Sequence, residues 1–324
     1  MTKAIRIHKT GGPQVLTQEN VQLREPGEGE VRLKHTAIGL NFIDCYHRSG
    51  LYPVELPLTL GSEAAGVIEA IGSGVTGLEL GQRVAYAGGQ TGSYCEARNI
   101  NANVLIKLPN EIKDQDAAAM MLKGMTAHML MFKCYRVKKG DIILVHAAAG
   151  GVGSIMCQWA NALGATVIGT VGSDEKAKKA LKNGCHHPIN YSKEDFSERV
   201  SEITRGEGVP VVYESIGKAT YEKSMACLSS FGVLVNYGNA SGPIPAIEPL
   251  ELMRQGSLAL SRPTLFNYTS NPIARERASS DLFNVVASGK VNIEIGQTFP
   301  LSETKAAHVA LEARQTTGST ILIP

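Results

Sequence analysis

The sequence predicts an α/β protein of two domains, a small β-barrel-type domain and an inserted domain built on a doubly wound parallel sheet. Three observations lead to this fold class. Residues 1–120 form short alternating runs between glycines and prolines, strands alternate with helix-length segments from Asp141 onward, and the tail after Pro263 abandons that alternation. A chain of 324 residues is long enough for two domains with separate cores.

The first 120 residues are predicted to be mostly strand. Residues 29–35, 65–72 and 81–86 carry apolar side chains at alternate positions and are bounded by turn-forming residues. This pattern is typical of a small barrel. Near Asp114 the pattern changes, and residues 116–124 and 126–130 are predicted to be helical.

From Asp141 the pattern indicates a parallel sheet. The expected strands are residues 142–146, 166–171, 188–190, 209–213, 232–237 and 257–261. The expected helices between them include residues 175–182, 193–204 and 221–228. Six strands separated by helix-length segments are typical of a doubly wound sheet.

The tail is expected to return to the first domain. A helix is predicted over residues 275–288, ended by Gly289, and strands over 291–295 and 318–323. The predicted domain limits are therefore 1–122 for the first domain, 123–265 for the sheet domain and 266–324 for the returning segment.

Composition narrows the function classes. The apolar content is 43%, and 32 basic against 30 acidic side chains give a net charge of +2, with no basic block that would suggest nucleic acid as a partner. The N-terminal pattern is that of a strand, and no stretch has the length of a signal peptide or membrane span. Six scattered cysteines form no C-x-x-C pair, so we expect a soluble cytoplasmic protein without disulfides.

Residues 142–153 (IILVHAAAGGVG) predict a dinucleotide-phosphate site. An apolar strand enters a small-residue turn, and a helix follows whose free N–H groups would face a pyrophosphate. Ala148 stands where the first glycine of G-x-G-x-x-G would be, so an ordinary strand-to-helix turn is the alternative. His146 at the strand end is interpreted as a packing residue.

The end of the second sheet strand bears on the choice of coenzyme. It carries Gly172 where NAD-binding units place an acidic residue, and Ser173 and Lys176 follow. The absence of a carboxylate favours a 2′-phosphate, and hence NADPH over NADH. Asp174 could be the acidic group if the strand ended two residues later, and Lys176 could be a solvated side chain.

These motifs together resemble one family. The segments that carry the resemblance are residues 41–44 (NFID), 48–53 (RSGLYP), 61–66 (GSEAAG), 146–153 (HAAAGGVG), 189–191 (INY), 237–239 (YGN) and 261–263 (SRP). The chain resembles the zeta-crystallin-like, NADPH-dependent quinone oxidoreductases of the medium-chain dehydrogenase/reductase superfamily. The resemblance covers essentially the whole chain. It implies a GroES-like catalytic domain, a Rossmann coenzyme domain and a homodimer joined through the latter.

The resemblance also implies which residues bind the coenzyme. They are Asn41, Thr126, Gly150, Gly151, Val152, Gly153, Gly172, Ser173, Lys176, Tyr191, Ser215, Tyr237, Gly238, Asn239 and Arg262. Tyr191 would lie beside the 2′-phosphate.

Zinc ligands of the superfamily are replaced here. The cysteine position of the zinc enzymes is Asn41 and the histidine position is Ser62, so a catalytic zinc site has lost two ligands. Cys45 is displaced along the chain, and the adjacent side chains of residues 185–187 cannot easily converge on one ion. No metal site is predicted.

Without a Lewis acid, the hydride acceptor must itself be electrophilic, and a quinone meets that condition. Asn41, Tyr46 and Tyr52 are assigned to the reaction, the tyrosines as hydrogen-bond donors to the substrate; half-buried packing is the alternative for both tyrosines. An alkenal or enone reductase is the alternative enzyme. An RNA-binding or structural crystallin-like protein is the alternative of a different class, against which the balanced charge argues.

Overall fold

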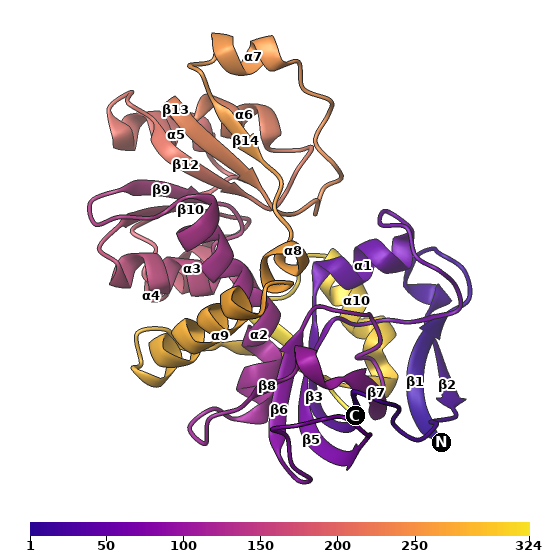
Figure 1. Ribbon diagram of the computed structural model, residues 1–324. Coiled ribbons are helices and arrows are strands. Elements are labelled where there is room, and N and C mark those ends of the chain that lie inside the picture. Colours follow the sequence, from indigo (N-terminus) through magenta and orange to yellow (C-terminus); the bar gives the residue numbers. More distant parts are fainter. The chain divides into compact units, whose positions relative to one another are not determined.

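Two separate β-sheet systems organise the computed structural model, which describes residues 1–324 (Figure 1). The first unit comprises Met1–Lys123, Pro272–Phe283 and Ile293–Pro324, and the second comprises Gly124–Asn271 and Asn284–Asn292. The chain thus leaves the first unit near the middle of one helix and returns to it twice. No helix reaches the length and hydrophobicity that crossing a bilayer requires.

The first unit is mostly antiparallel. Its seven-stranded sheet has the order β15-β16-β3-β5-β6-β8, with β7 also paired to β3, and a second sheet has the order β2-β1-β4. The strands are β1 (Thr2–Ile7), β2 (Thr17–Val21), β3 (Glu30–Leu40), β4 (Leu58–Thr59), β5 (Glu63–Ile71), β6 (Arg83–Ala87), β7 (Ala97–Asn101), β8 (Ile106–Lys107), β15 (Ile295–Pro300) and β16 (Ser319–Ile323).

The predicted strands of the first domain are confirmed. Residues 29–35, 65–72 and 81–86 fall within or next to β3, β5 and β6. Of the segment expected to return, β16 joins the first unit, because Ile321 pairs with Gly39 in β3, whereas residues 266–271 and 284–292 belong to the second unit. Alternate side chains of β3, such as Val31 and Leu33, are fully buried in one apolar cluster, as the period of two requires.

Four helices complete the first unit or link it to the second. They are α1 (Phe42–Ser49), α2 (Asp114–Met129), α9 (Pro272–Ala287) and α10 (Thr304–Glu312). The two predicted helical stretches at 116–124 and 126–130 form the single helix α2.

The second unit contains the predicted parallel sheet, in the order β11-β10-β9-β12-β13-β14. Its strands are β9 (Ile142–Val145), β10 (Thr166–Val171), β11 (His187–Asn190), β12 (Val209–Glu214), β13 (Leu228–Asn236) and β14 (Ala259–Ser261). All six expected strands are present and every pairing is parallel. The order reverses at β9, the topological switch point of a doubly wound sheet.

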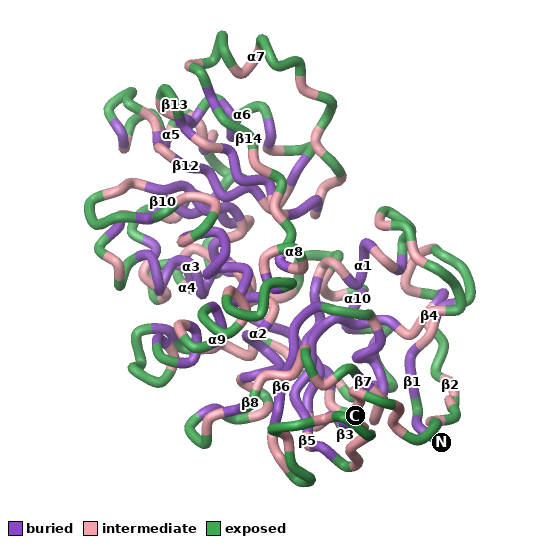
Figure 2. The backbone as a smooth tube through the Cα atoms, in the orientation of Figure 1, coloured by how far each residue is buried: buried purple, intermediate pink, exposed green.

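Five helices connect these strands, and α8 follows the last of them. They are α3 (Gly151–Ala162), α4 (Asp174–Lys182), α5 (Phe196–Thr204), α6 (Tyr221–Ala226), α7 (Pro249–Arg254) and α8 (Leu265–Thr269). Leu144, Ile168 and Val212 share one apolar cluster with side chains of α5 and α6. Their buried neighbours along the strands face the other side, because successive side chains alternate. Figure 2 shows the central strands of the parallel sheet as mostly buried.

One predicted strand is wrong. Residues 291–294 are not in a strand, and β15 begins only at Ile295. The N–H of Val291 bonds to the carbonyl of Val285 at the end of α9, and both backbone groups of Asn292 bond to the amide of Gln158. These backbone groups are satisfied by a helix end and a side chain, so no ladder forms there.

Candidate functional site

The turn after β9 has the close packing that a phosphate site needs. Gly150 is the N-cap of α3, and α3 begins at Gly151. A Cβ on Gly153 would lie 2.2 Å from the carbonyl oxygen of Ala147, so only glycine lets the helix approach the strand this closely. Ala147 adopts a left-handed φ of 53°. The N–H groups of the first turn of α3, near Val152, have no partner within the helix and carry a partial positive charge.

The turn after β10 brings together three residues expected near a 2′-phosphate. A Cβ on Gly172 would lie 2.7 Å from the hydroxyl oxygen of Tyr191, so that hydroxyl lies against the glycine. Ser173 is the N-cap of α4 and accepts a hydrogen bond from the Lys176 N–H at 3.3 Å. A serine, a lysine and a tyrosine thus gather at one helix start.

The alternative role of Asp174 as the ribose-binding acid finds no support here. β10 ends at Val171 as expected, and Asp174 is the first residue of α4. Its carboxylate accepts from Asn190 Nδ2 at 2.8 Å and pairs with Lys193 Nζ at 2.5 Å. Both carboxylate oxygens are therefore engaged by neighbouring side chains.

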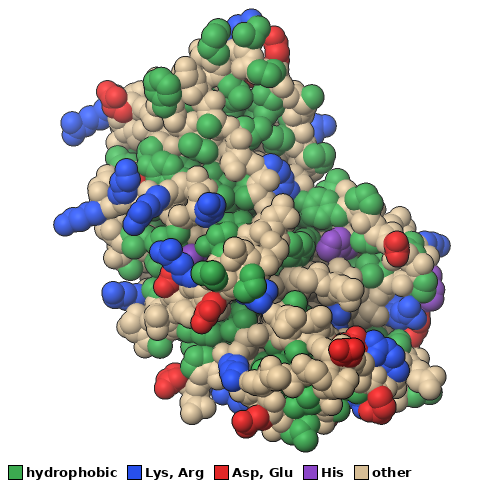
Figure 3. Space-filling model, in the orientation of Figure 1, with side chains coloured by type: hydrophobic (Ala, Val, Ile, Leu, Met, Phe, Trp, Pro, Cys, Tyr) green, Lys and Arg blue, Asp and Glu red, His purple; other side chains and the backbone are tan.

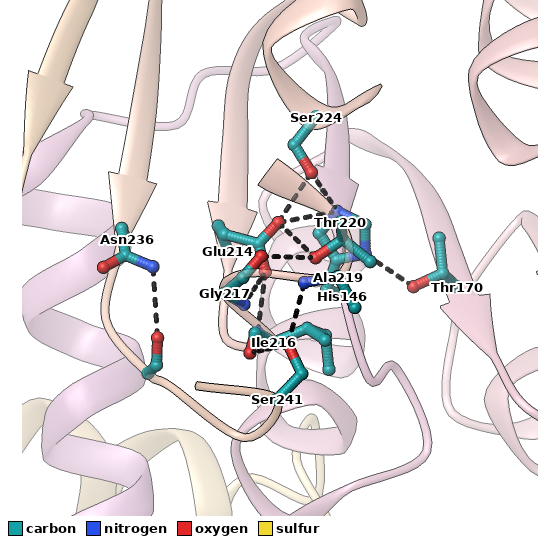
Figure 4. Close-up of polar contacts among 11 residues, drawn as sticks. His146, Thr170, Glu214, Ile216, Gly217, Ala219, Thr220, Ser224, Asn236 and Ser241 are labelled. Carbon is teal, nitrogen blue, oxygen red and sulfur yellow. Dashed lines mark hydrogen bonds and ion pairs between the residues drawn. The ribbon is translucent and has the colours of Figure 1, made fainter. Parts of the chain in front are cut away.

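The loops after β12 and β13 are tied to each other (Figure 4). Ser241 Oγ donates to the carbonyl of Ile216 at 2.8 Å, and the Ala219 N–H donates to Ser241 Oγ at 2.9 Å. A Cβ on Gly238 would lie 2.6 Å from the carbonyl oxygen of Ser215, so the two loops are in van der Waals contact. The hydroxyl of Ser215 is buried and has no hydrogen-bond partner.

Apart from Asn41, the remaining expected coenzyme residues also lie in the second unit. Tyr237 follows β13 directly, and its N–H bonds to the carbonyl of Glu214 at 2.8 Å. In the amide orientation that satisfies both neighbours, Asn239 accepts from Arg262 Nη2 at 3.2 Å. Thr126 lies in α2 and is 8% exposed.

The expected residues follow the carboxyl ends of all six strands. Residues 150–153 follow β9, 172–176 follow β10, 191 follows β11, 215 follows β12, 237–239 follow β13 and 262 follows β14. In an open parallel sheet this edge is where dinucleotides bind. The unpartnered Ser215 hydroxyl fits a polar ligand at this edge, which would supply the missing hydrogen-bond partner.

In the first unit a buried ion pair holds Asn41. Asn41 precedes α1, and its Nδ2 donates to Glu63 Oε2 at 2.8 Å. Lys123 Nζ lies 3.1 Å from the same oxygen, and Glu63 is fully buried. An ionised carboxylate only accepts hydrogen bonds, so the NH₂ group of Asn41, and not its oxygen, must face Glu63.

A series of hydrogen bonds beside α1 joins Arg48, His308, Tyr94 and Asp44. Arg48 can only donate, so its Nη1 donates to His308 Nδ1 at 2.9 Å. The proton of the neutral imidazole is then on Nε2, which lies 3.2 Å from Tyr94 Oη, and that hydroxyl donates to Asp44 Oδ2 at 2.8 Å. Asp44 Oδ2 also accepts from the Asn41 N–H at 2.9 Å.

Burial is the main influence on the pKa values of Asp44 and His308. It raises the pKa of Asp44 to about 7 against the opposing hydrogen bonds of Tyr94 and Asn41. It lowers the pKa of His308 to about 3, and the charge of Arg48 acts in the same direction. At neutral pH His308 is therefore uncharged, as the hydrogen-bond directions require.

The two expected substrate tyrosines lie together. Tyr46, in α1, and Tyr52, just after it, have ring centroids 5.2 Å apart at an interplanar angle of 64°. The Tyr52 N–H bonds to the carbonyl of Tyr46 at 3.1 Å. Tyr46 is 9% exposed and Tyr52 half-buried, so the pair forms one aromatic surface.

The candidate metal ligands weighed from the sequence are engaged elsewhere. Cys45 Sγ lies 3.5 Å from His308 Nδ1. Cys185 Sγ lies 3.6 Å from the carbonyl oxygen of Val167, and His186 Nδ1 accepts the N–H of Val167 at 3.0 Å. No group of three or more His, Cys, Asp or Glu side chains is arranged to hold an ion.

Sequence reasoning missed several buried charged side chains, and three of them, Glu63, Lys123 and Glu214, lie next to apolar runs. Each stands at the edge of an apolar run: Glu63 begins β5, Lys123 follows a buried stretch of α2, and Glu214 ends β12. A charged residue within such a run is the signal that could have found them, because an unpaired charge is not buried.

Comparison with known proteins identifies full-length relatives. The alcohol dehydrogenase GroES-like domain matches residues 27–110, and the zinc-binding dehydrogenase family matches residues 151–279. Quinone oxidoreductase of Pseudomonas aeruginosa is 48% identical and 2-haloacrylate reductase of a Burkholderia species is 48% identical, with 100% of this chain and at least 99% of each relative covered. The crystal structure of Escherichia coli quinone oxidoreductase complexed with NADPH has a TM-score of 0.98 at 45% identity, with both chains fully covered.

Proposed function

Because the chain belongs to the quinone oxidoreductase family of the medium-chain dehydrogenase/reductase superfamily, we propose that it transfers a hydride from NADPH to a quinone. The observation that carries the proposal is the carboxyl edge of the parallel sheet, where six strand ends present small, polar or basic residues. We assign the coenzyme role to residues 123–265 and the substrate role to residues 1–122 and 266–324.

Bound NADPH would supply the hydride. The N-terminus of α3 would face the pyrophosphate, and Ser173, Lys176 and Tyr191 would surround the 2′-phosphate. Ser215 would donate its unpartnered hydroxyl toward the nicotinamide half, and Gly238 lets the two loops that carry these residues pack closely.

On the substrate side, Tyr46 and Tyr52 would position the quinone by aromatic contact and by hydrogen bonds to its carbonyl oxygens. Asn41, held by Glu63, would present its amide oxygen in one orientation. Hydride addition leaves a hydroquinone anion, which takes one proton from water, so the reaction needs no dedicated acid.

Coenzyme choice is tested at Lys176. Lys176→Ala should raise the KM for NADPH at least tenfold while leaving that for NADH nearly unchanged, because a cation near the 2′-phosphate is lost. Lys178→Ala, which removes an exposed lysine of the same helix, is the matched control. Equal losses with both coenzymes would remove Lys176 from the phosphate site.

We propose that the reaction needs no metal. The basis is the donor set: an amide and a hydroxyl stand at the two ligand positions, and Glu63 already holds the amide of Asn41. NADPH oxidation by 1,4-benzoquinone should continue unchanged after dialysis against a chelator. Loss of the rate, with recovery on adding zinc, would contradict this.

A second candidate is reduction of a conjugated alkene. The relative named 2-haloacrylate reductase, at 48% identity, is the observation that favours it. A panel that compares 1,4-benzoquinone, an enone and 2-chloroacrylate decides: a higher kcat/KM for either alkene than for the quinone would make alkene reduction the main activity.

We further propose a cytoplasmic homodimer joined through the second unit. Strand β14 is an open sheet edge, and exposed apolar side chains lie near it: Phe231 is 79%, Met253 59% and Leu260 36% exposed. Figure 3 shows hydrophobic atoms at the surface over α7. Leu260→Asp should shift the sedimentation coefficient to that of a monomer; a wild type that already sediments as a monomer would contradict the dimer.

The cytoplasmic location is proposed from the cysteines. All six cysteines are free, as a reducing compartment permits.

A further inference from the structure

A chain of hydrogen bonds crosses the carboxyl edge of the parallel sheet beneath the proposed coenzyme loops (Figure 4). It joins Thr170 of β10, His146 just after β9, Ser224 of α6 and Glu214 of β12. Thr170 Oγ1 lies 2.8 Å from His146 Nδ1, His146 Nε2 lies 2.8 Å from Ser224 Oγ, and Ser224 Oγ lies 2.6 Å from Glu214 Oε2. All four side chains are completely buried.

The carboxylate of Glu214 sets the direction of the chain. It accepts from four donors: the N–H groups of Ile216 and Gly217 at 2.6 and 3.0 Å, and the hydroxyls of Thr220 and Ser224 at 2.8 and 2.6 Å. Four donors to one buried carboxyl group favour its ionised form.

The proton positions of the remaining members follow. The Ser224 hydroxyl donates to Glu214, so its oxygen accepts from His146 Nε2–H, and the free Nδ1 lone pair accepts from the Thr170 hydroxyl. Burial lowers the pKa of His146, which is consistent with this neutral imidazole. Each member has one assigned role as donor or acceptor.

Every strand member of the chain stands at the start of a proposed coenzyme loop. Thr170 is followed by residues 172–173, His146 by residues 147–153, and Glu214 by residues 215–217. Glu214 holds the third loop directly through two N–H groups, and that loop in turn contacts residues 238–242.

We propose that the Thr170–His146–Ser224–Glu214 chain is a positioning network that holds the coenzyme loops of three adjacent strands at a fixed spacing, matched to NADPH. The inference rests on the proposed function. His146 is its central member, because its two ring nitrogens connect β10 with α6 and β12. None of the four side chains is a catalytic residue, since all lie beneath the loops.

A purely structural role would be served better by apolar residues. Replacing a buried polar network with well-packed hydrophobic side chains is often neutral or stabilising, whereas a partly satisfied network is destabilising. Hydrogen bonds have a defined direction and length, whereas apolar contacts do not, so the polar chain fixes the spacing between the strand ends.

Two variants of Thr170 separate hydrogen bonding from packing. Thr170→Val keeps the shape and removes the hydroxyl, whereas Thr170→Ser keeps the hydroxyl and removes a methyl group. Ser224→Ala removes the central link. Thr204→Val is the matched control, because Thr204 is a buried threonine of the same unit whose hydroxyl bonds only within the α5 region.

The measurement is the Kd for NADPH by fluorescence titration, with the melting temperature of each free protein. Thr170→Val and Ser224→Ala should weaken NADPH binding about tenfold, the loss expected from one buried hydrogen bond. Thr170→Ser and Thr204→Val should bind NADPH within about twofold of the wild type, whatever their melting temperatures.

The outcomes are distinct. If Thr170→Val and Ser224→Ala lose melting temperature but keep the wild-type Kd, the network is structural only and the inference is overturned. If Thr170→Ser weakens binding as much as Thr170→Val, packing is responsible and the inference is again overturned. A wild type that does not bind NADPH would refute the proposed function itself, and the network's role with it.

Discussion

Replacing Asp44 by asparagine should remove a large pH dependence of stability. Asp44 is fully buried, and burial raises its pKa from the ordinary value of 3.8 to about 7. Its Oδ2 accepts from Tyr94 and Asn41, while Oδ1 lies 3.4 Å from Ser62 Oγ. An asparagine amide reproduces the protonated carboxyl group, because its oxygen can keep both strong donors and its NH₂ can face Ser62.

Whether the stability rises or falls with pH follows from the number of protons that the folded and unfolded states bind. The folded-state pKa of Asp44 lies above the unfolded value, so between about pH 4 and pH 7 the folded protein holds a proton that the unfolded chain has lost. The stability contributed by this proton is complete below the unfolded pKa and is lost as the pH rises through the folded pKa. A difference of about 3 units at about 1.4 kcal/mol each gives an upper limit of about 4 kcal/mol.

The assay is urea unfolding followed by far-UV circular dichroism at pH values from 5 to 8. Tryptophan fluorescence would not serve, because the single Trp159 lies in the second unit and Asp44 in the first. We expect the stability of the wild type relative to Asp44→Asn to fall by up to about 3 kcal/mol over this range. Glu28→Gln, which removes an exposed carboxylate of the same unit, should keep the wild-type slope.

Parallel pH profiles for the wild type and Asp44→Asn would refute the reasoning. They would mean that Asp44 is ionised throughout, with its donors outweighing burial. With the assay extended to lower pH, a rise in wild-type stability relative to the variant between about pH 3 and pH 5 would refute it more strongly, because it would place the folded-state pKa below 3.8.

Three further outcomes are expected. Gly153→Ala places a Cβ 2.2 Å from a backbone oxygen, so it should destabilise the protein by more than about 2 kcal/mol in urea and weaken NADPH. Lys123→Met leaves the buried carboxylate of Glu63 unpaired and should cost about 3–5 kcal/mol, whereas adding Glu63→Gln to it should restore part of the loss. Gly172→Ala should displace the exposed hydroxyl of Tyr191 and raise the KM for NADPH several-fold more than that for NADH, with a change in melting temperature of under about 2 °C.

The second unit was predictable because its signals are local. Largely apolar runs of three to six residues, separated by helix-length segments, predicted six parallel strands, and all six are present. Glycines and polar residues at the strand ends predicted where a dinucleotide would bind, since parallel strands bring their carboxyl ends to one edge. The same reasoning failed at residues 291–294, where backbone groups bond to the end of α9 and to Gln158.

The sequence by itself determined the fold class and the approximate positions of the strands of the parallel sheet, because periodicity and turn residues act over a few neighbours. Only the tertiary structure decided which polar and charged side chains are buried together. Glu63 and Lys123 are 60 residues apart in the chain, His146 and Ser224 are 78 apart, and Arg48 and His308 are 260 apart. Whether a charged side chain is buried depends on the partner that packing brings to it, and that partner leaves no trace in the local pattern.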